Sequence, residues 1–79
     1  MQSSIARKRR LADPAIVSYL IDEEFDVVVE ATTRSESYGL EITEILLDNG
    51  NRIVYQAIDG IGEAFYYDAK GHCYMTIEE

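Results

Sequence analysis

The sequence has no tryptophan, only one proline, one cysteine and one histidine, and no long apolar run. Its single cysteine, Cys73, excludes an internal disulfide and suits a reducing compartment. No apolar run approaches the roughly 18 residues that span a bilayer. Leu11-Ala12 is followed at once by Asp13-Pro14, which leaves no apolar core for a signal peptide. These absences predict a cytoplasmic protein that does not enter a membrane.

Basic residues are also scarce, and they are unevenly placed. The chain has seven lysines and arginines against fifteen acidic residues, a formal net charge of −8. Four of the seven stand together, as Arg7, Lys8, Arg9 and Arg10. The 69 residues that follow hold all fifteen acids against three bases, a net charge of −12. Such a body repels nucleic acid and anionic membranes and steers towards basic partners.

Length and composition indicate one small domain. A chain of 79 residues has room for one small core and little room for a deep substrate cavity. The 47% hydrophobic fraction argues against disorder for most of the chain. We expect residues 1–11 to form a basic, flexible arm and residues 12–79 to form a single α+β domain.

Asp13-Pro14 predicts the start of one N-terminal helix. Asp at the N-cap accepts hydrogen bonds from first-turn amides, and Pro suits the first helical position. The acids near its other end oppose the helix dipole, so the helix should end near Phe25. Its apolar stripe, interrupted by Glu24, consists of Val17, Leu20, Ile21 and Phe25.

The rest of the chain favours strands. Val27-Val28-Val29 is β-branched and predicts a first strand over residues 26–33. Residues 38–48 fit either a helix or a strand with a bulge near Thr43-Glu44, and the Asn49-Gly50 turn after them favours the strand. Further strands are expected over residues 52–58, 65–67 and 72–77. The predicted fold is therefore one helix packed on an antiparallel meander sheet of four to five strands.

The turns also predict a register for the two hairpins. A two- or four-residue loop at Asn49-Gly50 pairs Leu46 with Ile53, and the second hairpin pairs Phe65 with Tyr74. The first hairpin then has a face made of Ile42, Leu46, Ile53, Tyr55 and Ala57. The second has a face made of Phe65, Tyr67, His72 and Tyr74. In this register neither face of the sheet is polar, and one helix covers only one face, so the aromatic face is expected to bind a partner.

No catalytic, cofactor or metal motif stands out. Adjacent strand residues point to opposite faces, so His72 cannot activate Cys73 as a nucleophile. The same pair lacks the spacing of a zinc site. Gly60-Ile61-Gly62 is not a phosphate-binding loop. We therefore expect neither an enzyme nor a protein that carries a cofactor or metal.

These features suggest a small acidic binding protein that works by occluding a partner's surface. The expected form is an inhibitor or adaptor, of the phage or mobile-element type, that mimics nucleic acid and covers a basic surface. The residues expected to bind the partner are Phe65, Tyr67, His72, Tyr74, Asp22, Glu23 and Asp26.

Two alternatives stay open. One is a nucleic-acid-binding regulator whose arm uses Arg7, Lys8, Arg9 and Arg10 while the body dimerises. The other is a structural homodimer subunit whose sheet face is the interface.

Overall fold

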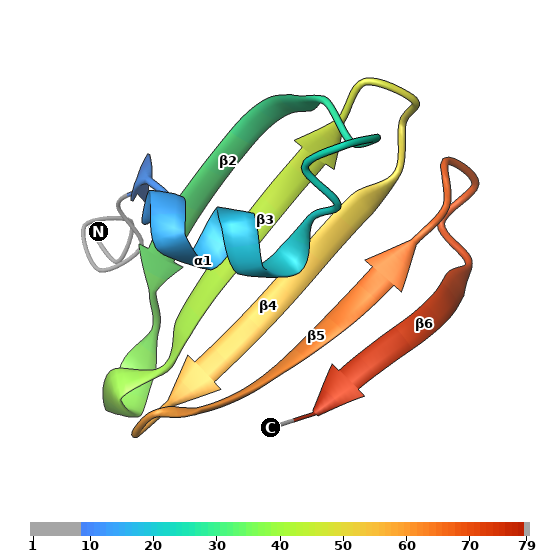
Figure 1. The fold of residues 1–79 in the computed structure, drawn as a ribbon. Helices are drawn as coiled ribbons and strands as arrows, with labels where there is room; N and C mark the ends of the chain where they lie inside the picture. The colour runs from blue at the N-terminus through green and yellow to red at the C-terminus, as the bar shows by residue number, and fades with distance from the viewer. Residues whose placement is uncertain (1–8, 79) are drawn as a thin grey trace, which may run out of the picture.

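The computed structural model describes residues 9–78 as one α-helix packed on a six-stranded antiparallel sheet (Figure 1). The sheet order β1-β2-β3-β4-β5-β6 is a meander, in which each strand pairs with its neighbour in the chain. The elements are β1 (Arg9–Leu11), α1 (Pro14–Leu20), β2 (Val28–Ser35), the short 3-10 turn η2 (Ser37–Gly39), β3 (Glu41–Leu47), β4 (Arg52–Ile58), β5 (Ile61–Tyr67) and β6 (Cys73–Glu78).

The α+β class is confirmed, but the predicted number of strands is too low. The additional strand is β1, which lies in the part of the sequence predicted to be a flexible arm and pairs with β2. The helix therefore follows a strand and is not the first element. In the part of the chain that the structure describes, no helix is long enough to cross a membrane, since α1 has only seven residues.

The start of α1 is as predicted. The side chain of Asp13 accepts a hydrogen bond from the backbone amide of Ala15 at 2.9 Å, and Pro14 occupies the first turn. These two residues satisfy or remove the amides that have no partner at the start of a helix.

The end of α1 lies five residues earlier than predicted. Ile21 is already extended, and the chain then turns around Asp22, whose amide donates to the Asp26 carboxylate at 2.8 Å. Phe25, which was expected on the apolar stripe, is 75% exposed. The acids after Leu20 satisfy their own turn instead of extending a helix whose dipole they oppose.

The turn between β3 and β4 makes the predicted register wrong by one residue. The amide of Leu47 donates to the carbonyl of Asn51 at 2.9 Å, so the loop is the three residues 48–50, with Gly50 at φ 91°. A three-residue loop of this kind commonly ends on a glycine in the left-handed region. The observed partners are Leu46–Arg52, Ile45–Ile53, Glu44–Val54 and Thr43–Tyr55.

This shift collects apolar side chains on one face. Ile45 and Ile53 lie opposite each other and are each only 1% exposed. A one-residue change of register moves a strand's side chains to the other face. Ile53 and Tyr55 therefore share a face with Ile45, and not with Ile42 and Leu46 as predicted.

β3 is a strand, as predicted, but it has no bulge. Its pairing with β4 is continuous, and Thr43, where a bulge was expected, faces the core and is 2% exposed. The hydroxyl groups of Thr43 and Thr33 are hydrogen-bonded at 2.8 Å. A buried polar group is tolerated where it has such a partner. The strand can therefore keep a regular register with Thr43 facing the core, and no bulge is needed.

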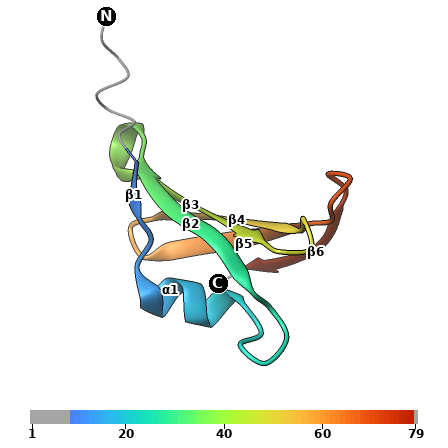
Figure 2. The same ribbon diagram turned by 90° about the horizontal axis from the view of Figure 1, so that it is seen from above.

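The sheet has a helix face, which α1 covers, and an open face (Figure 2). The helix face carries Ala31, Thr33, Thr43, Ile45, Leu47, Ile53, Tyr55, Ala64, Tyr66 and Ile77. The open face carries Thr32, Arg34, Ile42, Glu44, Leu46, Val54, Gln56, Glu63, Phe65 and Tyr67. Leu20 of α1 completes the buried core.

The prediction that neither face is polar is wrong for the open face. Arg34 bridges two carboxylates there, with Nε 2.9 Å from Glu36 and Nη1 2.6 Å from Glu44. Both bonds raise the pKa of Arg34, and the bond to Arg34 lowers the pKa of Glu44. The open face is thus a mixed surface with an ion-pair cluster, not a continuous apolar patch.

Candidate functional site

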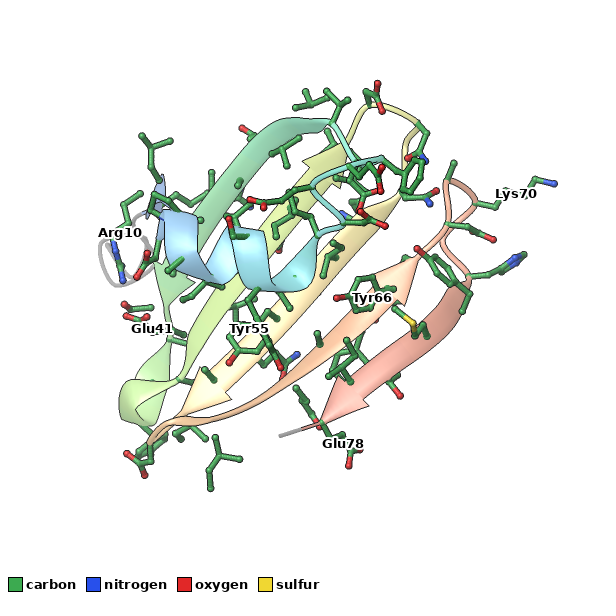
Figure 3. All side chains as sticks on the ribbon, viewed as in Figure 1. Arg10, Glu41, Tyr55, Tyr66, Lys70 and Glu78 are labelled. Carbon is green, nitrogen blue, oxygen red and sulfur yellow. The ribbon has the colours of Figure 1, made fainter. Side chains whose placement is uncertain are left out.

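A groove of about 550 Å³ lies between the end of α1 and the helix face of the sheet near β5 and β6. Its floor is apolar and includes Leu47, Ile53, Met75 and Ile77. Its rim includes the loop that follows α1. Figure 3 shows Tyr66 on β5 beside the end of α1. We call this site the acidic groove, because the charged residues that line it are Asp22, Glu23 and Asp26.

Each of the three carboxylates is held by a short local hydrogen bond. The hydroxyl of Ser18 donates to Glu23 at 2.6 Å, and the amide of Glu24 donates to Asp22 at 3.1 Å. The carboxylate of Asp26 accepts from the amide of Asp22 at 2.8 Å. Among the described residues, none of those lining the groove is basic, so no Lys or Arg neutralises these acids inside it.

Tyrosines form the wall opposite the acids. The Tyr66 hydroxyl donates to the carbonyl of Leu20, the last helical residue, at 2.7 Å. Its ring is tilted against that of Tyr74, with centroids 6.3 Å apart. Burial raises the pKa of Tyr66, and the neighbouring Tyr19, Tyr74 and Asp26 raise it further. This wall is therefore fixed to the helix by one hydrogen bond and lies next to negative charge.

The arrangement suits a cation with an apolar stem. A Lys or Arg head group is attracted by carboxylates and by the face of an aromatic ring, while its methylene chain packs on an apolar floor. Within residues 9–78, no three His, Cys, Asp or Glu side chains form a cluster that could hold a metal ion.

The structure separates the residues predicted to bind a partner into two groups. Asp22, Glu23, Asp26 and Tyr74 all line the acidic groove. Phe65 and Tyr67 lie on the open face.

The predicted pairing of Phe65 with Tyr74 is wrong, because the hairpin loop has three residues, 69–71, and β6 also contains a bulge. Tyr66 pairs with Met75 and Tyr67 with Cys73, so Tyr74 is the additional residue. A bulge re-aims the side chain that it inserts. Tyr74 therefore contacts Tyr66 and does not extend an aromatic patch on the open face.

His72 lies in the β5–β6 turn and belongs to neither group. Its ring Nδ1 is 3.7 Å from the carboxylate of Asp68, and its side chain is 77% exposed. Backbone amides, first that of His72 and also that of Lys70, hydrogen-bond to Asp68 and lower its pKa. The histidine thus contributes its backbone to the turn and extends its ring into solvent.

Two of the four basic residues of the predicted arm are part of the sheet. Arg9 and Arg10 belong to β1, and Nη2 of Arg10 is 2.7 Å from the Glu41 carboxylate. A flexible arm through Leu11 is therefore wrong for residues 9–11, whereas Arg7 and Lys8 lie outside the described residues.

Sequence reasoning did not assign Tyr19, Tyr66 or Met75 to a binding site. Tyr19 is close in sequence to Asp22 and Glu23, but α1 ends at Leu20, so helical spacing does not explain why they line the same groove. Tyr66 and Met75 lie opposite each other on β5 and β6, but the sequence contains no signal that α1 ends above them.

No protein-family model, curated protein or solved structure matches this chain.

Proposed function

We propose that this protein is a non-catalytic binding protein that recognises a basic surface of a partner protein through the acidic groove. The observation that supports this proposal is the convergence of Asp22, Glu23 and Asp26 with Tyr74 on one groove, where no lining residue from 9–78 is basic. The net charge of −12 on residues 11–79 adds long-range attraction towards a basic partner. Occluding such a surface is how an inhibitor or adaptor would act.

The small free energy of each single contact favours a macromolecular partner over a small cation. An exposed ion pair contributes only about 0.2–1 kcal/mol, and a cation on a tyrosine ring adds about 0.5–1 kcal/mol. A single basic group would therefore bind weakly. Several lysines or arginines on one partner, with apolar stems on the groove floor, would accumulate enough free energy for a stable complex.

The test compares two variants that change the net charge equally. The groove variant carries Asp22→Asn, Glu23→Gln and Asp26→Asn. Its amides can still accept the three local hydrogen bonds, so the loop should keep its conformation. A matched control carries Glu30→Gln, Asp59→Asn and Glu63→Gln, which do not line the groove.

The probe is a short lysine-rich peptide titrated into each full-length protein at low salt. We expect the groove variant to bind at least about tenfold more weakly than the wild type, and the control less than about threefold. Equal losses in the two variants would show that net charge alone drives binding and would contradict the proposal. Absence of binding by the wild type at about 20 mM salt would also contradict it.

A further inference from the structure

β6 is an open edge of the sheet. It pairs with β5 on one side, and in the sheet order no described strand pairs with its other side. Every second residue of an edge strand directs its backbone amide and carbonyl outwards, ready to pair with another chain. Five of the six residues of β6 are exposed.

The two edges of the sheet differ in how they are protected. In the described part of the chain, which begins at Arg9, β1 has three residues, and two of them are arginines. Short length and positive charge are common devices against unwanted pairing. β6 contains no Pro, Lys or Arg, and beyond the bulge at Tyr74 its pairing with β5 is regular from Met75 to Glu78. This stretch is the part of the edge that can accept a strand.

The accepting edge borders the acidic groove. Met75 and Ile77 line the groove from β6, and Tyr74 stands at the start of the same strand. A strand added beside β6 would lie about 4.8 Å away, and alternate side chains would point to the same side as Met75 and Ile77. Those side chains would enter the groove that holds Asp22 and Asp26.

We propose that β6 binds an extended, lysine- or arginine-rich segment of the partner protein as a seventh strand. The inference rests on the proposed function and specifies how the basic partner is held. Backbone hydrogen bonds to Met75–Glu78 fix the segment, and every second basic side chain enters the acidic groove.

Charge selects this occupant over a second copy of the chain. Pairing β6 with β6 of another copy would bring together two chains that each carry a net charge of −8, with their acidic grooves side by side. Like charges at an interface are costly. A basic strand meets the same groove with opposite charge.

The test uses two peptides with the same charge. Both have about eight residues in which lysine alternates with valine. In the second peptide, alternate backbone amides are N-methylated, which blocks strand pairing and keeps every side chain. Binding to the full-length protein is measured by titration, and hydrogen exchange of the β6 amides is followed by NMR.

We expect the unmethylated peptide to bind at least about tenfold more tightly than the methylated one. It should also slow exchange at alternate amides of residues 75–78. Equal binding of the two peptides, with unchanged β6 exchange but shifted groove resonances, would overturn the added strand and leave the proposed function standing. Binding of neither peptide would overturn both.

A second copy as the occupant would also overturn this inference. It would appear as β6 amides that are already protected in the free protein, together with a concentration-dependent mass near twice 9.0 kDa in sedimentation.

Discussion

Thr33 and Thr43 place two hydroxyl groups on the buried helix face, where they are hydrogen-bonded to each other at 2.8 Å. Thr43→Val should lower the free energy of unfolding by about 1–3 kcal/mol, because it leaves the Thr33 hydroxyl buried without its partner. The double variant Thr33→Val/Thr43→Val should return to within about 0.5 kcal/mol of the wild type or exceed it. Urea denaturation measures both. Additive losses in the double variant would contradict this account.

Tyr66 links the sheet to the end of α1. Tyr66→Phe should lower the free energy of unfolding by about 1–3 kcal/mol at neutral pH, because the Leu20 carbonyl loses its donor. A matched control is Tyr38→Phe, which changes a side chain that is 95% exposed and should have little effect.

The same residue makes stability depend on alkaline pH. The folded-state pKa of Tyr66 is raised above its ordinary value of 10.0, so above that pH the unfolded chain loses its proton first. The contribution of Tyr66 to stability is therefore complete below pH 10.0 and disappears as pH rises through the folded-state pKa. Tyr66→Phe should show a shallower loss of stability above pH 10.0 than the wild type in chemical denaturation. An unchanged slope would contradict this assignment.

At the scale of elements, the contact between β4 and β5 depends on a glycine. A Cβ atom on Gly62 would lie only 2.6 Å from Cζ of Tyr55, a residue of β4. Gly62→Ala should therefore lower the free energy of unfolding by about 1–3 kcal/mol, because the ring must move. Thermal or urea denaturation gives the value.

The control for this prediction removes the ring first. In a Tyr55→Leu background, Gly62→Ala should be neutral or stabilising, because alanine loses less backbone entropy than glycine on folding. An equal loss in both backgrounds would show that the backbone, and not the ring, requires glycine at position 62.

At the scale of the whole molecule, acidic repulsion works against folding. Residues 9–78 hold fourteen of the fifteen acids and five of the seven basic residues, a net charge of −9. Salt screens this repulsion, which raises stability. Salt also weakens exposed ion pairs such as Arg10–Glu41, but each such pair contributes little, so this loss is the smaller effect. The free energy of unfolding should therefore rise by about 0.5–1 kcal/mol between roughly 20 and 200 mM NaCl.

Urea denaturation at constant pH measures this salt dependence. The groove and control triple variants described above each remove three negative charges, so both should show a smaller increase than the wild type. A decrease of stability with salt would mean that the ion pairs outweigh the repulsion.

The sequence by itself determined the features that depend on a few neighbouring residues. Asp13-Pro14 predicted the start of α1, and Asn49-Gly50 predicted the turn and hence a strand in residues 38–48, of which Glu41–Leu47 form β3. The acids after the helix were correctly identified as a surface group. Capping, turn conformation and charge are local properties, so a short stretch of sequence contains them.

Only the tertiary structure decided the register, the faces and the groove. A loop of three residues instead of two or four placed Ile53 opposite Ile45. A second three-residue loop, together with the bulge at Tyr74, placed Phe65 opposite Thr76 and away from the Tyr74 ring. A one-residue difference in a loop costs little locally, yet it exchanges the two faces of a strand. Packing against Leu20 and Tyr66 favours one register, and this packing involves residues far apart in the chain.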